Sequence, residues 1–368
     1  MHRLMVGMIS LVACLALQLG MAPVGLAKST YVYVHDPNAG GGIWAFSMDK
    51  RGGLAPVPGS PFALVDQPSD CRGLCQTMAY SSKRKVLVTG GTTGVTSWSV
   101  AKDGSLAPVT GSPFNSGGDD YVGTAVVQAG KRAFAYGASF LTDEVRGFEI
   151  LTDGTLQALP GGPAPTGAGP AGMEARKRLL FVANQEDLTV STFAIGKDGT
   201  ITPAPGSPMA LPGAAFVFNV NADPKGKRVY VHDDGDDTGG LIYGFGVDKR
   251  SAALSPLAGS PFRTFPVGGK TGLAVAKKLL FAFDFEDETN DIHPFRIGKN
   301  GVLVDTDIII SSGLILHAHW IDPKGKRLIV AGPTVLATVK ASKDGSLETS
   351  DVATLPGIEP TAIVVVKR

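Results

Sequence analysis

The sequence predicts an all-β protein, a seven-bladed β-propeller of four-stranded blades that is closed by its C-terminal strand pairing with the N-terminal blade. Three observations predict this fold. A leucine-like residue recurs seven times after a turn, and an apolar residue precedes each copy at a nearly constant distance. The two ends of the chain also complement each other, as the parts of one blade would.

The recurring leucine belongs to a repeated unit. The unit reads as an apolar strand, a Lys-Gly-Lys-Arg-type turn, two further strands, an Asp-Gly turn, the leucine and then Gly-Ser-Pro-Phe. The seven copies are Leu54, Leu106, Leu156, Ile201, Leu254, Leu303 and Leu347. They lie 44 to 53 residues apart, which is the usual length of a four-stranded propeller blade.

A second set of anchors precedes the leucines. It consists of Phe46, Trp98, Phe148, Phe193, Phe245, Phe295 and Val339. The offset to the leucine is 8 residues in six copies and 9 in the fifth. So constant a spacing predicts a hairpin between the third and fourth strands of each blade, with Asp-Gly supplying the positive φ of the turn. Both anchors are expected to face the layers between blades.

The chain ends predict closure of the ring. The first repeat begins at Tyr31-Val-Tyr-Val, which has the pattern of a second strand and lacks a first strand before it. The chain finishes with Pro360-Thr-Ala-Ile-Val-Val-Val366, which has the pattern of a first strand with no blade after it. Pairing the two would complete a composite blade and remove an open sheet edge.

The strands Tyr31-Val-Tyr-Val-His-Asp, Leu180-Phe-Val-Ala-Asn and Val229-Tyr-Val-His-Asp, together with Asp-Gly-Ser-Leu and Gly-Ser-Pro-Phe, resemble a Tyr-Val-Thr-Asn type of propeller repeat. On these motifs the chain resembles the lactonase-type seven-bladed propellers, which include phosphogluconolactonase-like and carboxymuconate-cyclase-like proteins. The resemblance implies lactone hydrolysis by His, Arg and Glu side chains around the central channel. Its motifs are packing and turn residues, so they specify the fold more than the activity.

Residues 1–27 are expected to form a cleaved signal peptide, followed by a single propeller domain over residues 28–368. Arg3 precedes an almost continuously apolar run from Leu4 to Gly20, and Gly25-Leu-Ala27 supplies small residues for cleavage. The run is short for a membrane span. We therefore expect a periplasmic or secreted protein. A lipoprotein anchored at Cys14 is the alternative, although the residues after Cys14 stay apolar.

The charge balance bears on partners. Without residues 1–27 the chain has equal numbers of basic and acidic residues, so its net charge is zero. A neutral chain is expected to have no electrostatic footprint for nucleic acid or for an anionic membrane surface. We expect a monomer whose partner is a small molecule or a protein at the channel face, with no cofactor and no bound metal.

The candidate catalytic residues are His317, His319, Arg72 and Asp120, all in loops or strands expected at the channel face. Strand alternation puts both histidines on one face, about 7 Å apart. They could act as general base and oxyanion donor or bind a metal, or they could be strand histidines with backbone partners. His35 is placed on an outer loop of another blade, with no part in chemistry.

Arg72 and Asp120 lie in equivalent loops of adjacent blades, within Asp70-Cys-Arg72 and Asp119-Asp-Tyr121. They could hold an acidic or lactone substrate, or they could cap turns and stay solvated. Cys71 and Cys75 could form a short disulfide, or a reactive or metal-binding pair.

Two acidic loops, at residues 232–237 and 284–291, could bind Ca²⁺ or remain solvated. Neither has the full twelve-residue ligand pattern of a calcium loop. No Gly-x-Ser-x-Gly elbow, His-Glu-x-x-His helix or phosphate-binding glycine loop occurs in the sequence.

Two functions are compatible with the sequence. The first is an exported propeller that binds a small ligand, a glycan or a protein at its loop face without catalysis. The second is a lactonase-like hydrolase that opens a small lactone at the central channel, with His317 or His319 activating water and Arg72 holding the carbonyl or carboxylate.

Overall fold

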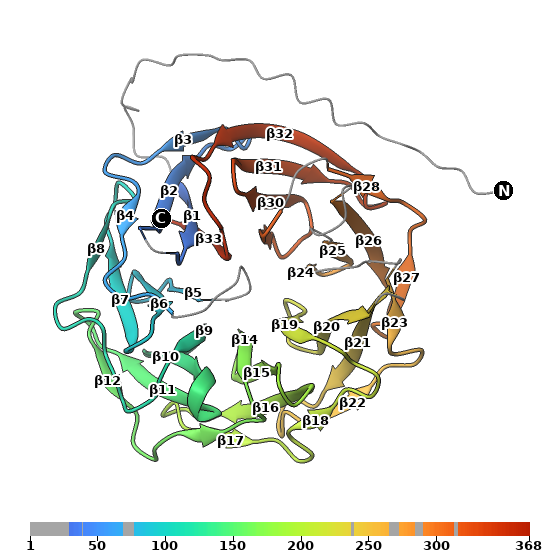
Figure 1. Ribbon diagram of the computed structural model, residues 1–368, viewed down its shortest axis with the longest axis horizontal. Coiled ribbons are helices and arrows are strands. Elements are labelled where there is room, and N and C mark those ends of the chain that lie inside the picture. Colours follow the sequence, from blue (N-terminus) through green and yellow to red (C-terminus); the bar gives the residue numbers. More distant parts are fainter. Residues whose placement is uncertain are drawn as a thin grey trace.

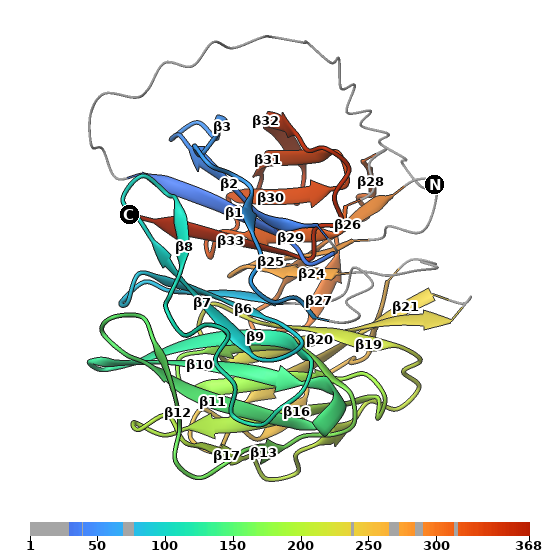
Figure 2. The ribbon, with the colours of Figure 1, turned by 60° about the vertical axis from the view of Figure 1, so that its left-hand side comes forward.

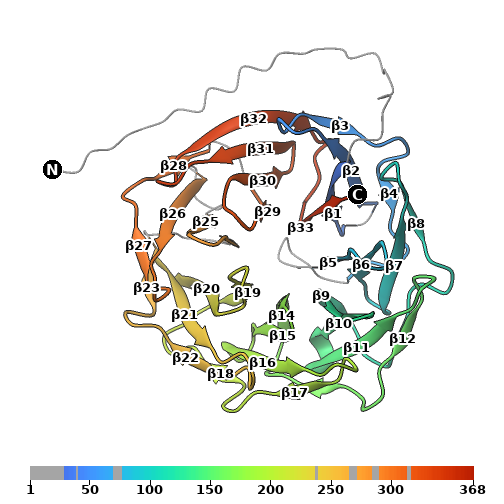
Figure 3. The ribbon, with the colours of Figure 1, turned by 180° about the vertical axis from the view of Figure 1, so that it is seen from behind.

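The computed structural model describes residues 29–38, 40–68, 77–236, 239–264, 272–283, 290–312 and 316–368. Seven antiparallel sheets stand around a central axis, as the two views along that axis show (Figure 1, Figure 3). Figure 2 shows the same blades from the side. The one helical element in this part of the chain is a 3₁₀ turn, η1 (Phe140–Thr142). The predicted all-β, seven-bladed propeller is confirmed.

Each blade places its first strand next to the axis and its fourth at the rim. The first strands are β33 (Ala362–Lys367), β5 (Met78–Ser81), β9 (Tyr121–Ala129), β14 (Pro170–Arg176), β19 (Val217–Ala222), β24 (Gly272–Val275) and β29 (Ala318–Ile321). The second strands are β1 (Thr30–Asp36), β6 (Val86–Gly90), β10 (Arg132–Ser139), β15 (Leu179–Asn184), β20 (Arg228–Asp236), β25 (Leu279–Phe283) and β30 (Arg327–Gly332).

The outer strands complete the blades. The third strands are β2 (Gly42–Met48), β7 (Val95–Val100), β11 (Glu144–Ile150), β16 (Thr189–Ile195), β21 (Gly239–Val247), β26 (Asp291–Ile297) and β31 (Val335–Ala341). The fourth strands are β3 (Leu54–Pro56), β8 (Leu106–Pro108), β12 (Leu156–Ala158), β17 (Ile201–Pro203), β22 (Leu254–Pro256), β27 (Leu303–Asp305) and β32 (Leu347–Thr354). Five blades add a two-residue strand beside the third: β4 (Phe62–Ala63), β13 (Ala164–Pro165), β18 (Met209–Ala210), β23 (Phe262–Arg263) and β28 (Ile310–Ser311).

The ring closes as the chain ends predict. Strand β33 pairs antiparallel with β1, from Thr30 opposite Lys367 to His35 opposite Ala362. The first strands contact one another around the whole axis, and β33 also contacts β5 of the second blade. The C-terminal strand β33 is therefore the innermost strand of the first blade and covers the inner edge of β1 (Figure 1).

Both sets of anchors occupy their predicted places. The upstream anchors all lie in third strands, and every one is at most 6 % exposed. The leucine-like anchors all begin fourth strands, and they are less buried because they lie nearer the rim. Seven apolar clusters fill the seven layers between adjacent blades, and each third-strand anchor belongs to the layer shared with the preceding blade. The hydrophobic core is thus a ring of layers.

The Gly-Ser-Pro-Phe motif ties the rim loop to the third strand. In four blades the serine hydroxyl accepts a hydrogen bond from a third-strand amide, for example from Ala45 N to Ser60 Oγ at 2.8 Å. The proline that follows is joined by a cis peptide bond in all four copies. The next residue, phenylalanine in three copies and Met209 in the fourth, then pairs with the start of the same third strand, as Phe62 does opposite Ile43.

A hydroxyl links neighbouring blades at one recurring place. In three blades a second-strand tyrosine donates to a carbonyl in the outer hairpin of the next blade: Tyr33 to Gly104, Tyr136 to Gly199 and Tyr230 to Gly301, at 2.7–2.8 Å. In three others the second-strand residue has no hydroxyl, and its third-strand partner donates instead: Ser97 to Gly154, Thr192 to Ala252 and Thr338 to Gly52. The donor thus lies on the second strand in some blades and on the third strand in others, whereas the acceptor is always a carbonyl in the outer hairpin of the next blade.

The two donor positions are cross-strand neighbours. Tyr33 lies opposite Ala45, whereas Ile329 lies opposite Thr338. A small residue therefore accompanies each tyrosine, and a hydroxyl accompanies each apolar residue. The sixth blade has Phe281 opposite Pro294, and neither side chain carries a hydroxyl.

We expect Leu106→Ala to lower the free energy of unfolding by about 2–5 kcal/mol, the usual cost of deleting a buried leucine. Leu106 is 8 % exposed and packs in the layer between the first two blades. Lys102→Ala is the control on the preceding turn, because the Lys102 side chain is exposed and its carbonyl remains to accept from Tyr31. Urea denaturation measures both. Equal losses at the two positions would contradict the assigned register.

Candidate functional site

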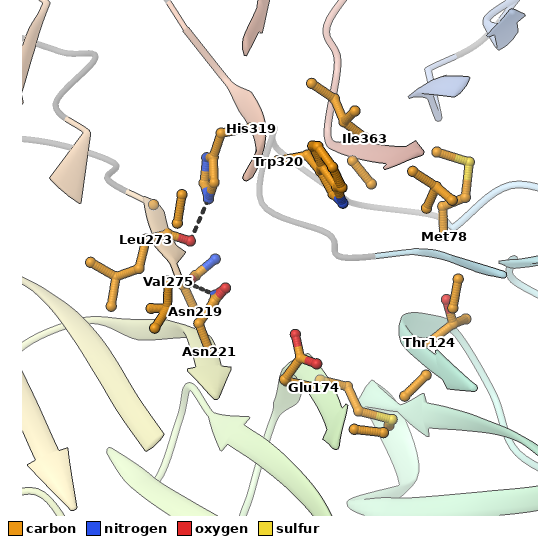
Figure 4. Close-up of a pocket in the computed structure, with 18 of the residues that line it drawn as sticks. Met78, Thr124, Glu174, Asn219, Asn221, Leu273, Val275, His319, Trp320 and Ile363 are labelled. Atoms are coloured by element: carbon orange, nitrogen blue, oxygen red, sulfur yellow. Dashed lines mark hydrogen bonds between the residues drawn. The ribbon is translucent and has the colours of Figure 1, made fainter. Parts of the chain in front are cut away.

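A cavity of about 370 Å³ occupies the central channel. All seven first strands contribute to its wall, and Figure 4 shows several of their side chains around one open space. The apolar part of the wall includes Met78, Met173, Phe218, Trp320 and Ile363. A cavity of this volume is in the range that holds small molecules.

Glu174 and Arg176 supply charge to this wall from strand β14. They form an ion pair through Glu174 Oε1 and Arg176 Nη1. The Glu174 side chain is 19 % exposed, and loss of solvent raises the pKa of its carboxyl above the ordinary value, although Arg176 acts in the opposite direction.

Amide and hydroxyl groups lie on the neighbouring walls. Asn219 and Asn221 alternate on strand β19, so both side chains lie on one face, and Asn221 Nδ2 donates to Asn219 Oδ1 at 2.7 Å. Thr124 on β9 has a buried hydroxyl for which the described part of the chain offers no hydrogen-bond partner. Figure 4 places these groups on both sides of Glu174. The cavity thus combines an ion pair with neutral hydrogen-bonding groups.

His319 reaches the cavity wall from strand β29, but its ring is held by the neighbouring blade. Its Nε2 lies 2.7 Å from the Leu273 carbonyl oxygen and donates to it, and the ring stacks on Phe283 at 4.5 Å. Gly272 permits this position, because a Cβ there would lie 2.1 Å from the imidazole. Burial lowers the pKa of His319 to about 4, so the ring is neutral at physiological pH.

The other predicted catalytic residues are distributed unevenly. His317 also lines the cavity, just before β29, and its amide donates to Ala331. Asp120 is 3 % exposed and is not among the described residues that line the cavity. It sits in the left-handed region at φ 52°, with its amide donating to Thr92 and its carbonyl accepting from Phe140. Arg72 lies outside the described residues. Of the four, the structure brings His317 and His319 to one cavity.

The placement of His35 on an outer loop was wrong. His35 belongs to strand β1 and is completely buried. Its Nδ1 lies 2.7 Å from Thr77 Oγ1 and 3.3 Å from Thr361 Oγ1, where β33, β1 and the start of β5 meet. Burial lowers its pKa to about 3. The repeat motif Tyr31-Val-Tyr-Val-His-Asp already includes His35 in the strand, and the structure agrees with that motif.

Of the three candidate metal or disulfide sites, the cysteine pair and the second acidic loop are largely untested. Cys71, Cys75 and most of the loop at 284–291 lie outside the described residues. Within the described ranges, no group of three or more His, Cys, Asp or Glu side chains has the arrangement of a metal site. No described helix is long and apolar enough to span a membrane.

The sequence reading missed Glu174, Arg176, Asn219 and Asn221. A usable signal existed, because Pro170-Ala-Gly-Met-Glu-Ala-Arg176 places a carboxylate inside a first strand, where the other blades have mainly small or apolar residues. A charge in the strand nearest the axis points to the channel.

Comparison with solved structures extends these observations. A "putative 6-phosphogluconolactonase" from Bacteroides fragilis superposes with a TM-score of 0.71 at 16% identity, covering 94% of this chain and 100% of the other. The lactonase-type propeller fold is shared. The resemblance read from the repeat motifs is confirmed at the level of fold.

Two further structures agree with this lactonase-type fold. The periplasmic gluconolactonase of Pseudomonas aeruginosa gives a TM-score of 0.68 at 14% identity, covering 92% of this chain and 99% of the other. A functionally unknown protein from Desulfotomaculum acetoxidans gives 0.63 at 14% identity, with the same coverage. No protein-family description matches the chain, and no curated protein matches its sequence. Identities this low establish a common fold and leave the activity open.

Proposed function

We propose that this protein binds a small, uncharged, hydroxylated molecule, such as a sugar or a sugar lactone, in its central cavity. The observation that carries the proposal is the composition of the wall. The charges of Glu174 and Arg176 are paired with each other, so the wall presents no unbalanced charge from these groups. Carboxylate, guanidinium and amide groups together match the mixed donors and acceptors of hydroxyl groups.

An aromatic ring adds to this match. Trp320 lies on the cavity wall beside Ile363, across the open space from Glu174 (Figure 4). An indole presents an apolar face with a polar edge, which suits the C–H face of a sugar ring and its hydroxyls. Binding without catalysis also agrees with the neutral, backbone-bonded His319.

Lactone hydrolysis is the second candidate, and the raised pKa of Glu174 favours it. In this scheme the Glu174 carboxylate removes a proton from water, and the water oxygen attacks the lactone carbonyl carbon. Arg176 stabilises the oxyanion; the ring C–O bond then breaks, and the leaving oxygen takes the proton back from Glu174. The names of the gluconolactonase-type neighbours agree with such a substrate.

The assignment of His317, His319, Arg72 and Asp120 as catalytic stays a prediction. A histidine whose pKa is about 4 is a weak base at neutral pH, which makes Glu174 the better candidate for activating water. Export to the periplasm or outside the cell, with removal of residues 1–27, stays part of the proposal.

We expect Glu174→Gln to separate binding from hydrolysis. The amide keeps a hydrogen-bonding group of the same shape and cannot accept a proton from water. If the protein only binds, calorimetric titration with D-glucono-δ-lactone and with glucose should show affinity within about tenfold of the parent protein. If it hydrolyses the lactone, turnover should fall by roughly 10²-fold or more, as on loss of a general base.

Glu149→Gln is the matched control. Glu149 pairs with Arg132 and is also 19 % exposed, but it lies on the third strand of its blade, outside the cavity. Equal effects of the two substitutions would contradict a special role for Glu174. No binding of any sugar or lactone by the parent protein would contradict the proposal itself. Turnover that depends on His319 and not on Glu174 would support the histidine assignment.

A further inference from the structure

Positive charge is concentrated around one end of the central channel. The turns that join first to second strands all lie on the same face, because every blade runs outward from the axis in the same direction. Each of the six turns carries two or three Lys or Arg, counting the adjoining strand ends, and Lys367-Arg368 contributes the seventh set. The acidic residues within these turns, all of which the structure describes, are Asp223 and Asp322. We call this set the basic ring.

The arginines of the basic ring are largely occupied by the fold. Arg84 donates to the carbonyls of Ile150 and Lys131 in the next blade, Arg228 donates to Lys299, and Arg327 donates to Lys50. Lys131 belongs to the next turn of the ring, and Lys299 and Lys50 belong to the outer hairpins of the next blades. The turns of the ring therefore share this face with the outer hairpins.

Four lysines of the basic ring are available to meet a partner. Lys131, Lys225, Lys277 and Lys324, on four different blades, are all exposed. Within the described part of the chain none of these four forms an ion pair. Exposed ammonium groups that form no ion pair attract an external polyanion, and the basic residues of the ring far outnumber Asp223 and Asp322.

The opposite face carries the opposite sign. The loops on that face include Asp66, Asp119, Asp143, Glu186 and Asp187, with few basic residues among the described ones. The outer hairpins on the face of the basic ring carry aspartates as well as lysines and arginines, so the positive excess of that face comes from the basic ring. The net charge of zero therefore hides an uneven distribution over the two faces. The expectation of no electrostatic footprint was drawn from the sum alone and does not describe this distribution.

We propose that the basic ring docks this protein on an anionic phospholipid bilayer, with the acidic face directed away. A face made of short turns suits a plane. It offers no helix or ribbon for a DNA groove, and no exposed Trp, Tyr or Phe occurs among the described residues for stacking on single-stranded bases. Several lysines near a lipid surface act together, each adding to the attraction.

Ser29 lies in the basic ring, where its carbonyl accepts from the Arg368 amide. The basic ring alone carries the proposal, since residues 1–27 are expected to be removed. The inference does not depend on the proposed function of the cavity.

Vesicle co-sedimentation of the full chain tests the proposal. Vesicles contain either pure phosphatidylcholine or about 30 mol % phosphatidylglycerol in phosphatidylcholine. The apolar run should contribute equally to both, so the difference reports the basic ring. We expect stronger binding to the anionic vesicles, declining as salt rises from about 0.1 M to about 0.5 M. Equal binding to both compositions would overturn the proposal.

A matched pair of variants locates the contact. Lys131→Gln, Lys277→Gln and Lys324→Gln together should weaken anionic-vesicle binding by roughly 10²-fold. Ala63→Glu, Leu141→Glu and Ala210→Glu change the net charge equally on the opposite face, at exposed positions, and should leave binding within about threefold. Replacing the same three lysines by arginine should preserve it. Equal losses in the two triple variants, or duplex DNA bound as tightly as the anionic vesicles, would overturn a specific membrane contact.

Discussion

Removing residues 361–368 should leave a protein that is insoluble or that melts roughly 10 °C or more below the parent. The deletion takes away β33, the first strand of the first blade, together with the buried side chains of Ile363 and Val366. It exposes one edge of β1 and opens the contact between β33 and β5. It also removes Thr361, whose hydroxyl lies beside His35. Thermal melting by circular dichroism measures the effect.

Two further variants keep this result interpretable. Deleting Arg368 alone leaves all of β33 and should change the melting temperature little. Val366→Asp keeps the chain length and introduces a carboxylate at a fully buried position, so it should reproduce most of the destabilisation. A full deletion that melts like the parent would mean that β33 does not close the ring in solution.

Acid should destabilise the protein well before its carboxylates are protonated. Burial lowers the pKa of His35 and His232 to about 3 and that of His319 to about 4. In the unfolded chain these histidines titrate near 6.5, so below that pH the unfolded state binds more protons than the folded state. The free energy of unfolding is therefore not reduced by these histidines above pH 6.5, and it decreases as the pH falls from 6.5 toward 4. Each fully buried histidine contributes on the order of 1.4 kcal/mol per pH unit in that window.

The measurement is a series of urea denaturations between about pH 7.5 and pH 4.5, where most carboxylates remain ionised. His35→Gln is the informative variant, because it removes a titrating group while keeping a side chain that can bond to Thr77. It should lower stability at neutral pH and flatten the dependence on pH. A parent protein equally stable at both ends of the range would contradict the buried, neutral state of these histidines.

The fold could be predicted because its determinants are local and repeated. An Asp-Gly turn, a leucine after it and an aromatic before it describe one hairpin, and seven copies can describe one closed ring. Pairing of the ends was predictable for a related reason. Tyr31-Val-Tyr-Val lacks a partner strand, and the final Ile-Val-Val-Val lacks a blade, so each supplies what the other needs.

The site could be predicted only in part, because burial and neighbours decide what a polar side chain does. His319 was correctly placed near the channel, but its bond to Leu273 and its stack on Phe283 come from another blade. His35 was placed on a loop although its own repeat motif, Tyr31-Val-Tyr-Val-His-Asp, is a strand. Asp120 does directly precede β9, but it is not among the described residues that line the cavity. Glu174 was overlooked because a sequence does not show which charged residues near a turn belong to the first strand. The blade geometry places the Glu174 side chain on the wall of the central cavity.

The hydroxyl that joins adjacent blades makes two residues interdependent across a strand pair. Replacing Tyr33 by phenylalanine would leave the Gly104 carbonyl without its donor, and replacing Ala45 by threonine alone would crowd the tyrosine ring. Making both changes would convert the first blade to the arrangement seen at Phe181 and Thr192. Divergence between repeats can therefore proceed in matched pairs. When the repeats are compared one position at a time, each position varies. When the two cross-strand positions are taken together, each pair except that of the sixth blade supplies one hydroxyl donor to the next blade.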